Sequence, residues 1–135
     1  MIKKLLFTLL IGFFISVSTQ AQDIEGSWSW NSQDGVNMFT IDLIRTSENN
    51  YRGNHCSVYL NGDRLDCREN EQDSTIVLIR KSENIFQGSI RSGLSNSIGN
   101  VQLQYLPNED SILFSLKSNP KGEYYMPLEG RLQRN

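Results

Sequence analysis

Two cysteines placed symmetrically about an Asn-Gly pair are the feature that most constrains the fold of this chain. Asn61 and Gly62 lie between two short strand-like runs and favour a type I′ hairpin turn, because both central residues of that turn need a positive φ. Counting outward from this turn puts Cys56 directly opposite Cys67. Facing residues of an antiparallel pair have Cα atoms about 4.5–5.5 Å apart, which suits a disulfide. The sequence therefore predicts a hairpin with a disulfide between its own two strands.

The N-terminal segment has the pattern of a secretory signal peptide, which places the cysteines in an oxidising compartment. Lys3 and Lys4 precede an apolar region of 13 residues at 5–17, and Ala21 ends a motif of small residues typical of a cleavage site. Thirteen residues are too few to cross a bilayer. We therefore expect residues 1–21 to be cleaved from an exported protein that is periplasmic or extracellular.

Cleavage after Ala21 leaves a mature chain of 114 residues (22–135), which is enough for one domain. Loss of the two lysines leaves 11 basic residues against 15 acidic ones, a net charge of −4. That charge suits a soluble protein, and it argues against the basic surface that a nucleic acid or an anionic membrane requires. We expect a monomer with no nucleic-acid partner and no membrane insertion after cleavage.

Strand-like runs separated by turn residues every 8–12 positions predict an all-β fold for residues 22–135. No window of this part keeps the 3.6-residue apolar period of an amphipathic helix. Eight or nine strands joined by short turns are most simply arranged as an antiparallel up-and-down meander. Closing that meander into a barrel removes its exposed edges, so an eight- or nine-stranded barrel is predicted.

An internal repeat adds to this prediction. Residues 41–53 match residues 76–88 at a constant offset of 35, with eight of thirteen positions identical. Each copy contains a strand, a Ser-Glu-Asn turn and a second strand that carries an aromatic-x-Gly motif. The repeat predicts that the two hairpins occupy equivalent places in one sheet. Its glycines mark bends of the kind that curl a sheet into a barrel.

Gly26-Ser27-Trp28, at the start of the first predicted strand, resembles the Gly-x-Trp signature of the lipocalins. The resemblance implies a lipocalin-like barrel whose floor is closed by Trp28, with a late arginine, Arg131 or Arg134, packed over the indole ring. The other interpretation, a core tryptophan beside a turn, stays open. The mature chain also resembles small exported β-proteins of Bacteroidota with an early Gly-x-Trp and a Cys…Asn-Gly…Asp-Cys hairpin. That second resemblance implies no function.

One face of the predicted hairpin gathers tyrosine, arginine and histidine, which are residue types common at binding hot spots. With an aromatic residue from a later run added, the candidate binding residues are Tyr51, His55, Tyr59, Arg64, Arg68 and Tyr124. Turned outward, this face is a solvated surface or a protein-binding patch, and the solvated surface is the favoured interpretation. Turned inward, it lines a polar lumen for an anionic or hydroxylated ligand.

No set of residues predicts catalysis or a metal site. His55 is the only histidine, and neither a His-x-His nor a His-x-x-Glu spacing is present. Ser57, His55 and Asp66 come close in the hairpin register, but no Gly-x-Ser-x-Gly elbow accompanies them. We therefore expect a protein that is not an enzyme and uses no cofactor.

The function predicted from the sequence is that of an exported, lipocalin-like binding protein for a small molecule. This prediction rests on analogy between folds, because no residue pattern identifies the ligand. The alternative is a secreted protein-interaction module, such as an enzyme inhibitor. An open lumen favours the first function, and a filled core favours the second.

Overall fold

The structure, a computed structural model, describes residues 23–68 and 73–135. The predicted signal peptide and its cleavage at Ala21 lie outside the described residues. Within the described ranges, no helix is long and apolar enough to cross a membrane. The strands are β1 (Gly26–Asn31), β2 (Met38–Ser47), β3 (Asn50–Tyr59), β4 (Arg64–Cys67), β5 (Ile76–Ser82), β6 (Ile85–Arg91), β7 (Ile98–Leu106), β8 (Ser111–Ser118) and β9 (Glu129–Arg134).

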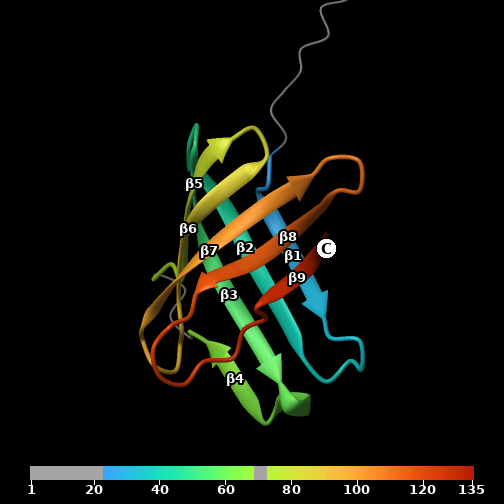
Figure 1. Cartoon of the computed structure of the whole chain (residues 1–135), viewed down its shortest axis with the longest axis vertical. Helices are drawn as coiled ribbons and strands as arrows, with labels where there is room; N and C mark the ends of the chain where they lie inside the picture. Colours follow the sequence, from blue (N-terminus) through green and yellow to red (C-terminus); the bar gives the residue numbers. More distant parts are fainter. Residues whose placement is uncertain (1–22, 69–72) are drawn as a thin grey trace, which may run out of the picture.

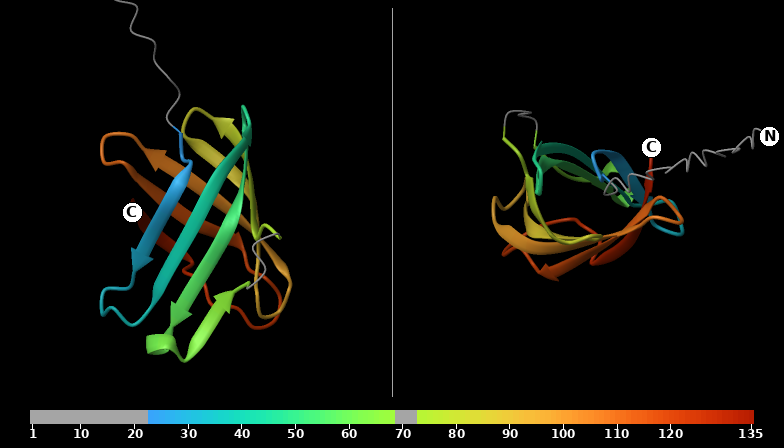
Figure 2. Two further views of the ribbon diagram at one scale, coloured as in Figure 1. Left: turned by 180° about the vertical axis from the view of Figure 1, so that it is seen from behind. Right: turned by 90° about the horizontal axis from the view of Figure 1, so that it is seen from above.

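Eight of these strands form a closed antiparallel barrel. Strands that follow one another in the chain are neighbours in the sheet, except that β4 and β5 do not pair with each other and both pair with β3. The ring closes where β1 meets β9, through Trp28 opposite Arg134 and Ser29 opposite Gln133. Figure 1 shows the tilted strands, and the view from above in Figure 2 shows the closed ring. The predicted all-β meander barrel is confirmed, with eight strands in the barrel and a ninth outside it.

Strand β4 is the one outside the ring, because β3 is long enough to pair with two strands along one edge. Asn50–Gly53 of β3 pair with β5, and Cys56–Tyr59 pair with β4. The chain therefore makes a hairpin past the end of β5 and then returns to continue the barrel. In Figure 1, β4 lies beside the arrowhead of β3 at the lower end of the molecule.

The predicted hairpin turn is present in the β3–β4 connection. Asn61 and Gly62 have φ values of 53° and 96°, and the Asp63 N–H donates to the Leu60 carbonyl at 3.2 Å. These are the marks of a type I′ turn. Strand pairing nevertheless stops one residue earlier on each side, because Leu60 also has a positive φ and donates its N–H to the Asn37 side chain at 3.0 Å.

The two copies of the sequence repeat form the hairpins β2–β3 and β5–β6 with the same register, so their predicted equivalence is confirmed. The repeat glycines have a common cause. A Cβ atom at Gly53 would lie 1.8 Å from the carbonyl oxygen of Asp42, and one at Gly88 would lie 1.7 Å from that of Val77. Only glycine lets the neighbouring strand approach so closely.

The barrel interior is filled by side chains. Seventeen hydrophobic residues in the described ranges are at most 5 % exposed and form one core. Their rings are in contact, as shown by Tyr51 and Phe86 at 5.3 Å between centroids and by Phe39 and Phe114 at 4.9 Å. A ligand-sized cavity would leave accessible surface on the side chains around it. These core side chains have almost none.

Trp28 packs against the side chain of Arg134. The indole is fully buried, its Nε1–H donates to the Ile24 carbonyl at 2.9 Å, and the Arg134 guanidinium lies 4.2 Å from the ring centroid. The sequence analysis left open whether Arg131 or Arg134 packs over the indole ring. The structure shows Arg134 in this position. Leu132 points inward, so Arg131 points outward by strand alternation, and it pairs there with Glu109.

Candidate functional site

The rare residues of the β3–β4 hairpin lie at the end of the barrel, and two of them point inward. His55 is 3 % exposed and Asp66 is 0 % exposed. The solvated surface favoured from the sequence is therefore wrong for this part of the face. The inward direction follows from β3, whose alternate residues Tyr51 and Gly53 also face the core.

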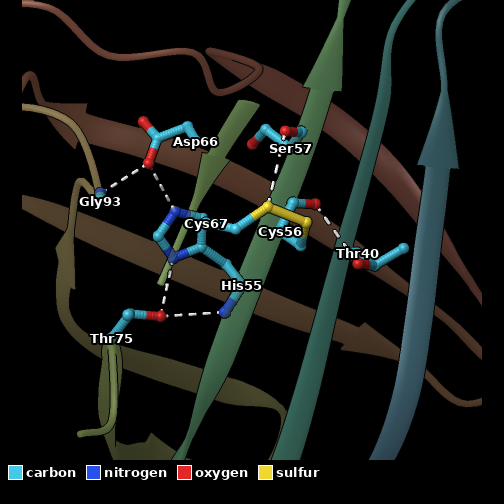
Figure 3. The surroundings of a disulfide bond; sticks show 8 residues. All are labelled: Thr40, His55, Cys56, Ser57, Asp66, Cys67, Thr75 and Gly93. Carbon is cyan, nitrogen blue, oxygen red and sulfur yellow. Dashed lines mark hydrogen bonds and ion pairs between the residues drawn. A yellow bond between two sulfur atoms is a disulfide. The ribbon is translucent and has the colours of Figure 1, made fainter. Parts of the chain in front are cut away.

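The buried Asp66 carboxylate accepts hydrogen bonds from four donors. His55 Nε2 lies 3.2 Å away, and the Ser92 hydroxyl donates at 2.9 Å. The backbone N–H groups of Gly93 and Tyr125 donate at 2.7 Å and 3.0 Å. Figure 3 shows the contacts with His55 and Gly93. One side chain thus joins β4 to β3, to the loop after β6 and to the segment between β8 and β9.

The His55 ring is held from both sides. Its Nδ1 lies 2.7 Å from the Thr75 hydroxyl, which also accepts the backbone N–H of His55 at 2.9 Å (Figure 3). All of these contacts are satisfied when Thr75 donates to Nδ1 and the ring proton on Nε2 points to Asp66. The Ser57 hydroxyl is buried and has no hydrogen-bond partner among the described residues. Ser57, His55 and Asp66 therefore do not form the chain of hydrogen bonds that a catalytic triad has.

The pKa values of Asp66 and Tyr59 are both shifted in this site. Burial raises the pKa of Asp66, but hydrogen bonds from His55, from two backbone N–H groups and from Ser92 lower it by more. The pKa of Asp66 therefore lies below its usual value of 3.8. Burial and the nearby charge of Asp66 raise the pKa of Tyr59 to about 12. At neutral pH the site consequently holds an ionised carboxylate beside a protonated phenol.

The opposite, outer face of the hairpin carries the disulfide. Cys56 and Cys67 are bonded, with Cα atoms 4.4 Å apart, as predicted. The next row of the sheet places Met38, Val58 and Leu65 side by side across β2, β3 and β4. Met38 is 40 % exposed and Leu65 is 54 % exposed, and Leu60 at the turn is 51 % exposed. The hairpin thus presents an apolar outer row, which consists of Met38, Val58 and Leu65.

One edge of β4 is open, since β4 pairs with β3 alone among the described strands. On the β4 side of β3, the Gly53 carbonyl accepts from Thr75 N–H and the His55 N–H donates to the Thr75 hydroxyl. Odd-numbered residues of β3 therefore direct their backbone groups to this side, and Asp66, opposite Ser57, hydrogen bonds to β3.

By the same alternation, Leu65 and Cys67 turn their backbone N–H and C=O groups away from β3. Gly93 covers the Cys67 end, because a Cβ atom there would lie 2.1 Å from the Cys67 carbonyl oxygen. Within the part of the chain that the structure describes, Leu65 is therefore the β4 residue whose outward backbone N–H and C=O groups have no partner.

The three tyrosines among the predicted binding residues lie in different parts of the structure. Tyr51 belongs to the core, where its hydroxyl accepts from Arg80 at 3.1 Å. Tyr59 is half-buried, with its ring 5.7 Å from that of Tyr125. Tyr124 is half-buried against the core, in the segment before β9. Strand β9 begins only at Glu129, so Tyr124 does not lie on a strand.

The two predicted binding arginines lie at opposite ends of β4. Arg64 is exposed and donates to the neighbouring Asp63 carbonyl at 3.0 Å. Arg68 is partly exposed, with its Nη1 3.6 Å from the Asp73 carboxylate, and it also donates to Asn96. The structure therefore does not bring all six predicted residues together in one site.

No sequence pattern indicates most of the hydrogen-bond partners of Asp66. Two of the donors, at Gly93 and Tyr125, are backbone groups that any residue type offers. Among the described residues, no group of three or more His, Cys, Asp or Glu side chains is placed to hold a metal ion. Comparison of the chain with protein-family models, with curated proteins and with solved structures found no match.

Proposed function

We propose that this chain is an exported, non-enzymatic module that binds a partner protein through strand β4 and the apolar row beside it. The observation that carries the proposal is a strand outside a closed barrel with one open edge. A barrel removes exposed edges, and an edge that remains is a template for pairing with another chain. Edge pairing is a common mode of peptide recognition.

The hairpin is built rigidly enough to serve as such a template. The disulfide ties β4 to β3 on the outer face, and the hydrogen bonds of Asp66 tie it to two loops on the inner face. Ordering a flexible strand costs free energy on binding, and a strand held in advance avoids much of that cost. The apolar outer row adds hydrophobic surface next to the open groups of Leu65.

The occupant that fits best is an extended, acidic segment of another protein. Arg64 and Arg68 lie at the two ends of β4. A second copy of the chain would bring these like charges together, whereas acidic side chains would complement them. Arg64 has no carboxylate partner among the described residues, and the Asp73 carboxylate that lies 3.6 Å from Arg68 is itself 64 % exposed.

A small-molecule ligand in the lumen, the other candidate, has less support. The interior is packed with side chains that are at most 5 % exposed. The polar groups that the sequence offered to such a ligand, His55 and Asp66, are already hydrogen bonded to the protein. The same engagement supports a non-enzymatic role, because both ring nitrogens of His55 serve the structure. Trp28 under Arg134 supports a relation to the lipocalins in fold, without a ligand.

The test uses capture of partners from the exported fraction of the source cells with two variants at one position. Leu65→Pro removes the open N–H, and proline is tolerated at a strand edge because Leu65 does not donate to β3. Leu65→Thr keeps that N–H and removes the apolar side chain. Leu128→Thr, at a residue 57 % exposed in the segment before β9, is the control.

We expect a stoichiometric partner that binds the wild-type protein and the control, binds Leu65→Thr more weakly and does not bind Leu65→Pro. The melting temperatures of all four proteins should agree. A partner that binds Leu65→Pro as well as the wild-type protein would refute the role of the β4 edge. A dimer that forms with rising concentration and is lost in Leu65→Pro would replace the partner protein by a second copy.

A further inference from the structure

Three arginines from separate parts of the chain meet in one depression on the outer wall of the barrel. Arg52 lies on β3, Arg68 follows β4 and Arg91 ends β6. The depression has a volume of about 400 Å³. The other described residues that line it are Asp73, Ser74, Val77 and Asn96. Three guanidinium groups thus share this wall with one described carboxylate.

Two of the guanidinium groups are positioned by Asn96. The Asn96 side-chain oxygen accepts from Arg68, and its backbone carbonyl accepts from Arg91 Nη1 at 3.1 Å. Asn96 itself has a φ of 60°, and its N–H donates to the Ser92 carbonyl at 3.1 Å. Since Ser92 also donates to Asp66, the arginines are anchored to the same hydrogen-bond network that holds β4.

The arginines keep unused hydrogen-bonding capacity. A guanidinium carries five N–H donors, and the contacts above use only some of those of Arg68 and Arg91. Within the described ranges, the Arg52 side chain has no hydrogen-bond or ion-pair partner. The Asp73 carboxylate is 64 % exposed and 3.6 Å from Arg68, so it compensates little of the local positive charge.

Among the described residues that line the depression, three arginines face one carboxylate, although the mature chain has an expected net charge of −4. Three like charges gathered in one depression repel one another, and an anion bound among them would remove that repulsion. The planar fork of arginine matches the paired oxygens of phosphate and sulfate groups, and the Ser74 hydroxyl adds a further donor to the wall.

We propose that the depression formed by Arg52, Arg68 and Arg91 binds a doubly charged tetrahedral oxyanion, a phosphate or sulfate group. The group is either a free ion or a substituent on a polymer such as a sulfated glycan. This site shares Arg68 with the surface proposed for the protein partner, but its test changes only Arg52 and Arg91, which lie outside that surface, so the test does not depend on the partner.

The test titrates the full mature protein with three probes at low ionic strength, namely inorganic phosphate, inorganic sulfate and a sulfated hexasaccharide. Binding is followed by NMR shifts of the backbone amides around Arg52 and Arg91. The variants are Arg52→Gln and Arg91→Gln, and Arg131→Gln, which alters an exposed arginine on β9, is the matched control. Melting temperatures confirm that the variants fold.

We expect saturable binding of at least one probe, weakened about tenfold or more in each site variant, as the loss of a charge-assisted hydrogen bond implies. The control should stay within about twofold of the wild-type affinity. Binding of the inorganic ions identifies a free oxyanion, and binding of the hexasaccharide alone identifies one carried on a polymer. No saturable binding of any probe at millimolar concentration would overturn the proposal, as would equal weakening in Arg131→Gln.

Discussion

The Asp66 carboxylate on β4 accepts the backbone N–H of Tyr125, 59 residues further along the chain, at 3.0 Å. This contact joins the strand outside the barrel to the segment that leads into the last barrel strand. With the contacts to Ser92 and Gly93, it makes the hairpin part of the folded barrel rather than an appendage of it. A surface for a partner protein can therefore be as rigid as the barrel wall.

Replacement of Asp66 by asparagine should lower the free energy of unfolding by about 2–3 kcal/mol at neutral pH. The amide nitrogen of asparagine cannot accept a hydrogen bond, so buried donors lose their partner. Urea unfolding of the mature protein measures the change. Asp63→Asn, at an exposed residue of the hairpin turn, is the control and should stay within about 0.5 kcal/mol of the wild-type value. Equal values for both variants would show that the network contributes no stability.

The stability that Asp66 contributes should depend on pH in a defined direction. Because its pKa is lower in the folded protein than its usual value of 3.8, the contribution is complete above that value. It is lost as the pH falls through the folded pKa. The difference in unfolding free energy between the wild-type protein and Asp66→Asn should therefore shrink as the pH is lowered from about 5. A difference that grows toward acid pH would contradict the lowered pKa.

Replacement of both Cys56 and Cys67 by alanine should destabilise the protein by about 2–3 kcal/mol. The closed loop spans a sequence separation of only 11 residues, so the loss of unfolded-state entropy on crosslinking is modest. Thermal unfolding of oxidised wild-type protein and of the double variant measures it. Mass spectrometry under non-reducing conditions provides the control, because two free thiols in the mature wild-type protein would refute the disulfide.

Replacement of Arg134 by alanine should cost about 1–2 kcal/mol, because the guanidinium lies over Trp28 and also donates to the Glu25 carbonyl at 2.9 Å. Arg131→Ala is the matched control on the same strand and should cost less than about 0.5 kcal/mol, since its pair with Glu109 is exposed. Chemical unfolding with tryptophan fluorescence measures both. A larger loss of stability in Arg131→Ala than in Arg134→Ala would indicate that Arg131, and not Arg134, packs over Trp28.

The features that follow from local rules were predictable from the sequence. The facing of Cys56 and Cys67 needs only the turn at Asn61 and Gly62 and the two-residue period of a strand. The closed barrel follows from short turns and from the repeat, since glycine at Gly53 and Gly88 allows neighbouring strands to approach.

The position of β4 outside the barrel was not predictable from the same rules. It results from competition between two strands for one edge of β3, and no local pattern decides that competition. The burial of His55 and Asp66 could not be predicted from the sequence for a similar reason. Their partners Thr75, Ser92 and Tyr125 come from distant parts of the chain, and only those contacts make the burial of a carboxylate tolerable.

Native mass spectrometry of protein purified from its source distinguishes a protein that acts through its outer surface from one that binds a ligand in its lumen. We expect the mass of the disulfide-bonded mature chain, either alone or with a stoichiometric protein partner. Because the core is packed, we expect that no small molecule is retained inside the barrel. Retention of one small molecule per native chain, other than phosphate, sulfate or a sulfated glycan, with release on denaturation, would show instead that the lumen holds a ligand.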